Sequence, residues 1–217
     1  NSPFWNLKKR GNRTEATFSL TLSADEVKTL PTAEINARIN EAFAYDDFAW
    51  QKASGVRVGM KGRAEGLHKV LYQCPRCKTE YRMATRADEL FCDACGKRWK
   101  MGEYGELAAL SGETEFSHIP GWYEWERANV AREVADGSYR FEGSVHVDSL
   151  PNAKGFVPLG PGTLTHDGTG FTLRGTYKGE PYAHHWDAAA LDSCHIEYEY
   201  LGKHGDCVDL NTLTDTM

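Results

Sequence analysis

The sequence contains no hydrophobic run long enough to cross a lipid bilayer. A membrane-spanning helix needs about 20 predominantly apolar residues, and no stretch of the 217 residues approaches that length. No apolar segment follows a basic start, so a secretory signal is not indicated. Hydrophobic residues still make up 41% of the chain and can build a core. We expect a soluble, cytoplasmic chain, with peripheral contact to the inner face of the membrane left open.

The sequence also lacks the short motifs of several enzyme classes. It contains no Gly-x-Ser-x-Gly element, no phosphate-binding loop and no dinucleotide fingerprint. Its histidines are scattered, and the adjacent pair His184 and His185 would point to opposite faces of a strand, where they cannot hold one metal together. We therefore expect no catalytic residue in this chain.

Disulfides are not the expected use of the six cysteines. Cys194 and Cys207 stand apart, whereas the other four form two Cys-x-x-Cys pairs separated by fourteen residues. These four are Cys74, Cys77, Cys92 and Cys95. Two such pairs supply the four sulfur ligands that Zn²⁺ takes in tetrahedral geometry at about 2.3 Å. The spacing predicts a four-cysteine zinc ribbon over residues 67–102 in a reducing compartment; two redox motifs or an iron–sulfur site are the alternatives.

The predicted zinc is structural. Four thiolates leave no open coordination position, so the metal cannot activate water or polarise a substrate. It would instead stabilise a unit of about 40 residues that is too small to be stable otherwise. Basic residues surround the predicted site and could contact anionic lipid or nucleic acid, although a simply solvated surface is the alternative. They are Arg76, Lys78, Arg82, Arg86, Lys97, Arg98 and Lys100.

The net charge of −6 is unevenly distributed. Residues 1–53 carry a net charge of 0, residues 54–102 carry +6 and residues 103–217 carry −12. This change in balance indicates three structural units, of which the basic one contains the clustered cysteines.

The first unit, residues 1–53, reads as a strand followed by helices. Alternating apolar residues predict a strand over 16–22, and Ser23 with Glu26 predicts a capping box that opens a helix over 24–30. A second helix is expected from Thr32 through Phe43 and on toward Trp50. These elements are too few for a core of their own, so we expect them to dock on another surface. The glycine-rich residues 54–66 read as a linker.

Residues 103–217 are expected to form a small antiparallel β domain with one helix packed on it. The helix is predicted over 120–135, beginning near Pro120 and stopping at Gly137. Alternation and turn residues predict about six strands, with a hairpin at Asp167-Gly168 because glycine accepts positive φ. The whole chain is therefore predicted to be α+β, with this sheet curled into a partial barrel or a sandwich.

Five stretches taken together resemble a known family. They are TEATFSLTL (14–22), NEAFAYDDFAWQK (40–52), GLHKVLYQCPRC (66–77), GETEFSHIPGWYEWE (112–126) and HDGTGF (166–171). In this order they are similar to the carboxy-terminal half of bacterial 1-acyl-sn-glycerol-3-phosphate acyltransferase-like proteins, and the similarity covers nearly the whole chain.

The resemblance implies that residues 1–53 are the last strand and helices of an acyltransferase domain whose catalytic core precedes Asn1 in a longer chain. That amino-terminal domain would be the main partner. Separately from this family, a zinc ribbon followed by a β-rich domain with a helix resembles a lipid- or protein-binding module of pleckstrin-homology type. The family's Asn-His-x-x-x-x-Asp and Glu-Gly-Thr-Arg elements are absent. His204 and Asp209 have the right spacing, but no Asn precedes His204, so no catalytic role is carried over.

The resemblance thus predicts an accessory, zinc-stabilised region of a phospholipid-synthesising acyltransferase that transfers no acyl group by itself. The basic face of the ribbon would rest on an anionic membrane. The rival interpretations are a zinc-ribbon protein that binds nucleic acid, which the acidic carboxy-terminal segment disfavours, and a protein-interaction module.

Overall fold

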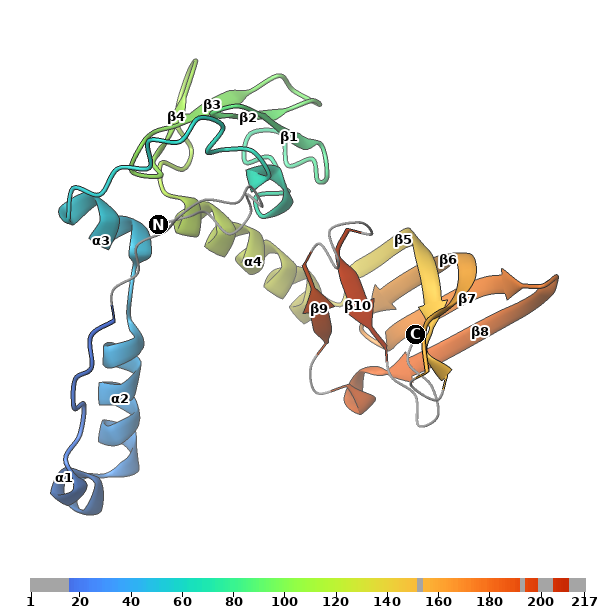
Figure 1. Cartoon of the computed structure of the whole chain (residues 1–217), viewed down its shortest axis with the longest axis horizontal. Coiled ribbons are helices and arrows are strands. Elements are labelled where there is room, and N and C mark those ends of the chain that lie inside the picture. The colour runs from blue at the N-terminus through green and yellow to red at the C-terminus, as the bar shows by residue number, and fades with distance from the viewer. Residues whose placement is uncertain (1–15, 152–153, 192–193, 199–204, 211–217) are drawn as a thin grey trace. The chain divides into compact units, whose positions relative to one another are not determined.

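The computed structural model of the chain describes residues 16–151, 154–191, 194–198 and 205–210 (Figure 1). The chain divides into two compact units, Asn1–Arg127 and Ala128–Met217. Each unit combines helical segments with antiparallel strands, so the predicted α+β class is confirmed. No helix in these ranges is both long enough and apolar enough to cross a membrane.

Three helices open the first unit: α1 (Ala24–Thr29), α2 (Thr32–Phe43) and α3 (Asp47–Ala53). The strand expected over 16–22 is wrong, because these residues have no regular structure and Phe18 and Leu20 are exposed. Alternation marks a half-buried strand only where a second strand pairs with it, and no strand of the described residues pairs with this segment.

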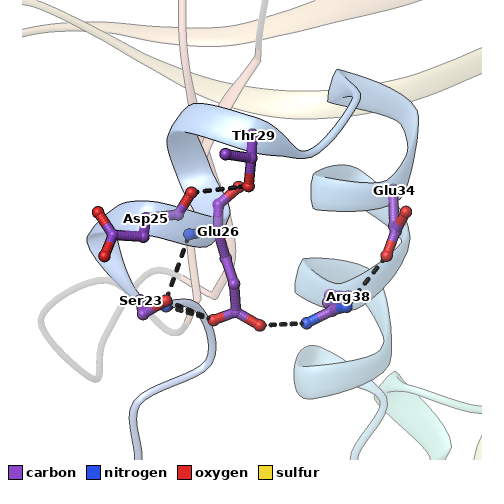
Figure 2. Close-up of polar contacts among 6 residues, drawn as sticks. All are labelled: Ser23, Asp25, Glu26, Thr29, Glu34 and Arg38. Atoms are coloured by element: carbon purple, nitrogen blue, oxygen red, sulfur yellow. Dashed lines mark hydrogen bonds and ion pairs between the residues drawn. The ribbon is translucent and has the colours of Figure 1, made fainter.

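The capping box predicted at Ser23 is confirmed and ties α1 to α2. The Glu26 N–H donates to Ser23 Oγ at 3.3 Å, and the Ser23 N–H donates to the Glu26 carboxylate at 2.8 Å. Figure 2 shows Arg38 of α2 reaching back to the same carboxylate, at 2.8 Å, and to Glu34. Hydrogen bonds from the Ser23 backbone and hydroxyl, and then from Arg38, lower the pKa of Glu26 to about 2. Glu26 therefore stays ionised and keeps the two helices together.

The second predicted helix is interrupted after Phe43, and α3 docks on the ribbon. Asp46 caps α3 by accepting from the Ala49 N–H at 3.0 Å. Phe48 packs against the ribbon core, and the buried Gln51 donates its Nε2 hydrogen to the Glu103 carbonyl at 3.2 Å. α3 thus belongs structurally with the cysteine unit.

The ribbon consists of a short 3-10 turn, η1 (Leu67–Lys69), and a four-stranded antiparallel sheet. Its strands follow chain order: β1 (Met83–Arg86), β2 (Glu89–Cys92), β3 (Arg98–Met101) and β4 (Leu107–Ala109). The glycines of residues 54–66 had suggested a linker, but these residues pack against the ribbon. Ala64 is fully buried, and the backbone N–H groups of Gly62 and Arg63 donate to the Asp88 carboxylate at 3.0 and 3.2 Å.

The predicted helix is α4 (Ile119–Asp136), but its tryptophans pack in the ribbon core and not in the core of the β domain. Trp122 lies edge-on to Trp99 of β3 with ring centroids 4.9 Å apart. The expectation failed because apolar spacing shows which face of a helix is buried but not which neighbour buries it. The largest side chains of this core are Trp99, Trp122, Leu67, Leu71, Leu90, Met101 and Leu107.

The second unit contains a four-stranded antiparallel meander and a two-stranded sheet in the described residues. The meander comprises β5 (Arg140–Ser149), β6 (Val157–Asp167), β7 (Gly170–Tyr177) and β8 (Glu180–Asp187), and a 3-10 turn, η3 (Ala188–Ala190), follows. The smaller sheet pairs β9 (His195–Glu197) with β10 (Cys207–Asp209). Strands therefore form at all six predicted places, with β5 and β8 as the two edges of the meander.

Both sheets contribute to one core, in which Leu164, Leu173 and Trp186 of the meander pack with Val208 and Leu210. The hairpin predicted at Asp167-Gly168 joins β6 to β7. The Asp167 carboxylate accepts from the Thr169 N–H at 2.9 Å and closes the turn. The positive φ falls on Gly170, at +123°, and not on Gly168.

Candidate metal centre

Two similar tight turns bring the four clustered cysteines together. In the first, the Lys78 N–H donates to the Cys74 carbonyl, and in the second the Gly96 N–H donates to the Cys92 carbonyl, both at 2.9 Å. Lys78 and Gly96 also share a left-handed backbone, with φ of 63° and 71°. The glycine was visible in the sequence, whereas the lysine in the matching position gave no such signal.

The sulfur positions match a tetrahedral zinc site. All four Sγ atoms lie within 4.8 Å of one another, and the Cys74–Cys95 and Cys77–Cys92 Sγ pairs are 3.8 and 3.7 Å apart. In a tetrahedron the ligand–ligand distance is about 1.63 times the bond length, so zinc–sulfur bonds of about 2.3 Å require about 3.8 Å between sulfurs. The cysteines Cys74, Cys77, Cys92 and Cys95 therefore fit a metal ion of this size, and none of the four forms a disulfide.

Backbone N–H groups aim at the sulfurs and prepare them to carry negative charge. Burial raises the pKa of the Cys74 and Cys92 thiols. Hydrogen bonds from backbone N–H groups later in each turn oppose that rise; in the first turn these are the N–H groups of Arg76 and Cys77. Burial also acts to raise the pKa of Cys77, but the hydroxyl and N–H of Thr79 and the neighbouring thiols outweigh it and lower the pKa to about 6. A bound Zn²⁺ would deprotonate all four thiols.

Helix α4 supports the first turn through two side chains that sequence reasoning missed. Trp122 donates its Nε1 hydrogen to the Gln73 carbonyl at 3.0 Å, and Glu126 accepts from the Gln73 N–H at 2.8 Å. Gln73 immediately precedes Cys74, and Gln73, Trp122 and Glu126 are all buried. The four-residue spacing of Trp122 and Glu126 places them on one helix face, but nothing in the sequence indicates that an acidic residue is buried there.

The seven predicted basic contacts separate into two groups. Lys97 is only 5% exposed, and its ammonium donates to the carbonyls of Ser111 and Glu113 at 2.8 and 2.6 Å. Lys78 donates to the Pro75 carbonyl at 2.7 Å and lies over the Trp125 ring. These two lysines therefore stabilise the ribbon itself. Lys78 is nevertheless exposed, and so are the other five residues, which are Arg76, Arg82, Arg86, Arg98 and Lys100.

No second metal-binding group of three His, Cys, Asp or Glu side chains occurs in the described ranges of the chain. Cys194 and Cys207 are free thiols, and Cys207 faces Glu197 across the β9–β10 ladder. His184 and His185 lie opposite Leu173 and Thr172 on β7, so they face opposite sides of the sheet as predicted. His204 lies outside the described residues.

Comparisons of the chain with protein-family models, curated proteins and solved structures found no match in any of the three. A closed set of four thiolates, supported by backbone hydrogen bonds and a buried helix, can hold an ion rigidly but offers a substrate no coordination position.

Proposed function

We propose that this chain is a zinc-stabilised, non-catalytic accessory region of a bacterial glycerophospholipid acyltransferase-like protein. The ribbon holds a helical hairpin, α1–α2, which docks on the acyltransferase domain of the same parent chain. Three features support the proposal: the order of motifs that resembles this family, the closed four-cysteine site and the exposed apolar surface of the hairpin.

The exposed surface of the hairpin is the observation that carries the proposal. Neither α1 nor α2 has a buried residue, although Ile35, Ile39 and Phe43 repeat at four-residue steps along α2. Phe43 is 81% exposed, and Phe18 just before α1 is 97% exposed. An amphipathic helix of this kind gains its stability by burying the apolar face against a partner. The hairpin therefore lacks its partner surface in the described residues.

The ribbon would give this hairpin a fixed attachment. Phe48 and Gln51 anchor α3 to the ribbon core, and only three residues separate α3 from α2. Zinc in the four-cysteine site would keep the ribbon folded, because a unit of this size gains much of its folding energy from its metal. The metal thus contributes to positioning and not to chemistry.

A hydrogen-exchange comparison of this chain with its full-length parent tests the docking. We expect the amides of α2 to exchange more slowly in the parent, because the acyltransferase domain covers Ile39 and Phe43. Ile39→Asp with Phe43→Asp in the parent should remove that protection and lower acyl transfer. Asn36→Asp with Asn40→Asp adds the same charge to exposed polar positions of α2 and should change neither.

Equal exchange of α2 in both chains would show that the hairpin does not dock there. A second check concerns the gene. The coding sequence upstream of Asn1 should contain an Asn-His-x-x-x-x-Asp element, and a parent chain without it would remove the acyltransferase part of the proposal.

A further inference from the structure

The ribbon sheet has one buried face and one open face. Leu90 of β2 and Trp99 and Met101 of β3 are at most 1% exposed and point into the core. Side chains alternate along a strand, so the residues between them point outward. The cross-strand partners confirm the same division, because Arg86, Glu89 and Lys100 form one row across three strands.

Four basic side chains lie on this open face. Arg86 of β1 and Arg98 and Lys100 of β3 are placed there by the register. Arg82 precedes β1, and its carbonyl accepts from the Asp93 N–H at 2.8 Å, which continues the ladder and puts its side chain on the same face. We call Arg82, Arg86, Arg98 and Lys100 the outer basic face; all four are exposed. With strands about 4.8 Å apart and about 3.3 Å per residue, the face covers roughly 10 by 13 Å.

Three of these cations are available for an external anion. Arg98 is engaged by Glu89, with a hydrogen bond of 2.7 Å. No ion pair of Arg82, Arg86 or Lys100 occurs among the residues that the structure describes. The clustering explains why the ribbon segment is basic although the chain as a whole is acidic.

The surroundings of the face favour a lipid surface over a nucleic acid. Single-stranded nucleic acids gain affinity by stacking bases on open aromatic rings. Here the guanidinium of Arg98 lies 5.0 Å from the centre of the Phe91 ring and covers the only aromatic side chain on the described strands of this face. Leu110 follows β4 opposite Arg98 and is 51% exposed. Cations beside an exposed leucine match the boundary between headgroups and acyl chains.

We propose that the outer basic face binds the anionic phosphate groups of a phospholipid bilayer surface. The choice of a phospholipid as the ligand rests on the proposed function. The choice of the contacting residues rests on the register of β1–β3. It assigns the contact to Arg82, Arg86 and Lys100 with Arg98 as a flanking cation. It leaves out Lys97, which is buried, and Lys78, whose ammonium is bound to the Pro75 carbonyl and lies over the Trp125 ring.

Vesicle co-sedimentation of the zinc-loaded chain tests the inference. Vesicles of phosphatidylcholine mixed with phosphatidylglycerol should retain the chain, and vesicles of phosphatidylcholine alone should not. Each basic residue near an anionic surface contributes about fivefold in partitioning, so Arg82→Gln with Arg86→Gln and Lys100→Gln should reduce retention about 100-fold. Added salt should weaken binding of the wild-type chain.

A matched variant separates the face from net charge. Arg132→Gln with Arg174→Gln and Lys178→Gln removes three exposed cations outside the ribbon and should retain wild-type binding. Zinc content and near-ultraviolet circular dichroism verify that each variant is folded. Equal retention on neutral and anionic vesicles, or unchanged retention of the first variant, would overturn the inference.

Tighter binding to short single-stranded or duplex DNA than to the anionic vesicles would also overturn it, and would favour a nucleic-acid-binding ribbon. None of these outcomes bears on the docking of α1–α2, which is measured by exchange at α2 in the absence of vesicles. A failure of the lipid inference is therefore distinguishable from a failure of the proposed function.

Discussion

The carboxyl group of Glu126 accepts a hydrogen bond from the backbone N–H of Gln73 at 2.8 Å. Glu126 is 1% exposed, and its second oxygen, Oε2, has no hydrogen-bond partner in the described residues. Burial raises the pKa of Glu126 to about 8, while the hydrogen bond from Gln73 opposes the rise and the nearby Glu80 adds to it. A Zn²⁺ ion bound by four thiolates would form a complex of charge −2, which would raise the pKa of Glu126 as Glu80 does.

The raised pKa of Glu126 predicts a loss of stability as pH rises. The folded chain holds a proton up to about pH 8, whereas the unfolded chain releases it near pH 4.5. The free energy of unfolding should therefore fall by at most about 1.4 kcal/mol per pH unit between these values and level off above them. Glu126→Gln should remove this slope, and denaturant titrations from about pH 6.5 to 9 measure it, where zinc stays bound.

Glu124→Gln is the matched control for this experiment. Glu124 is on the same helix and is exposed, with an ion pair to Arg127. Its variant should keep the wild-type slope. Titration of the cysteines affects all three proteins equally, so it cancels in the comparison. Parallel stability profiles for wild type and Glu126→Gln would show that Glu126 does not titrate in this range.

Loss of one cysteine ligand should unfold the ribbon. Cys92 is 1% exposed in the core beside Met83 and Leu90. Cys92→Ser should abolish zinc binding, and with it about 10 kcal/mol or more of metal-linked folding free energy. Elemental analysis should find one zinc per wild-type chain and none in the variant, and near-ultraviolet circular dichroism should report the loss of Trp99 and Trp122 packing.

Cys194→Ser is the control for that substitution, because this thiol belongs to the second unit and is not one of the four clustered cysteines. It should leave the zinc content at one per chain. A wild-type chain that is folded and fully reduced but contains no zinc would contradict the assignment of the metal centre.

Lys97 and Lys100, three residues apart in the sequence, should respond very differently to the same change. Lys97 is buried against two carbonyls, and its ammonium is also 3.6 Å from the Glu115 carboxylate, so Lys97→Met should cost about 3 to 5 kcal/mol by leaving them without a donor. Lys100→Met removes an exposed charge and should change stability by less than about 0.5 kcal/mol. Chemical denaturation of both zinc-loaded variants makes the comparison, and equal losses would contradict the placement of Lys97.

The same pair shows how far the sequence could predict the site. Cysteine spacing alone identified the four cysteines that the fold brings together, because a tetrahedral sulfur set requires a short-range pattern. The sequence showed how many basic residues surround the site but not which of them are buried. The side to which Lys97 or Lys100 points depends on the register of β3 between β2 and β4. Glu126 could not be found at all, since its burial depends on α4 packing against a segment about 50 residues earlier.

The fold was predictable to a similar degree. Turn residues and alternation located all six strands of the second unit, because hairpins are local. The prediction of a strand over 16–22 was wrong because no strand among the described residues pairs with this segment. The prediction of a linker over residues 54–66 failed because glycines also allow sharp turns in packed structure. Gly62 has a φ of 74°, and the turn there lets Ala64 reach the core.

A glycine at the contact between α3 and the ribbon provides a last prediction. Gly105 has a φ of 83°, and a Cβ atom there would overlap the Phe48 ring. Gly105→Ala should therefore cost about 2 to 4 kcal/mol, from left-handed strain together with overpacking. Gly55→Ala is the control, since Gly55 has a φ of 65° but no atom within 4 Å of its added Cβ, and it should show the strain alone, about 1 to 2 kcal/mol.

Removing the ring should relieve the clash. In a double-mutant cycle, Phe48→Ala with Gly105→Ala should destabilise the chain by less than the sum of the two single changes, because the added methyl group then occupies the space of the lost ring. Thermal unfolding measures the cycle, and hydrogen exchange in α3 should rise in Gly105→Ala but not in Lys100→Met. Additive losses would mean that Phe48 does not hold α3 on the ribbon, and the hairpin α1–α2 would then lack the attachment on which its docking depends.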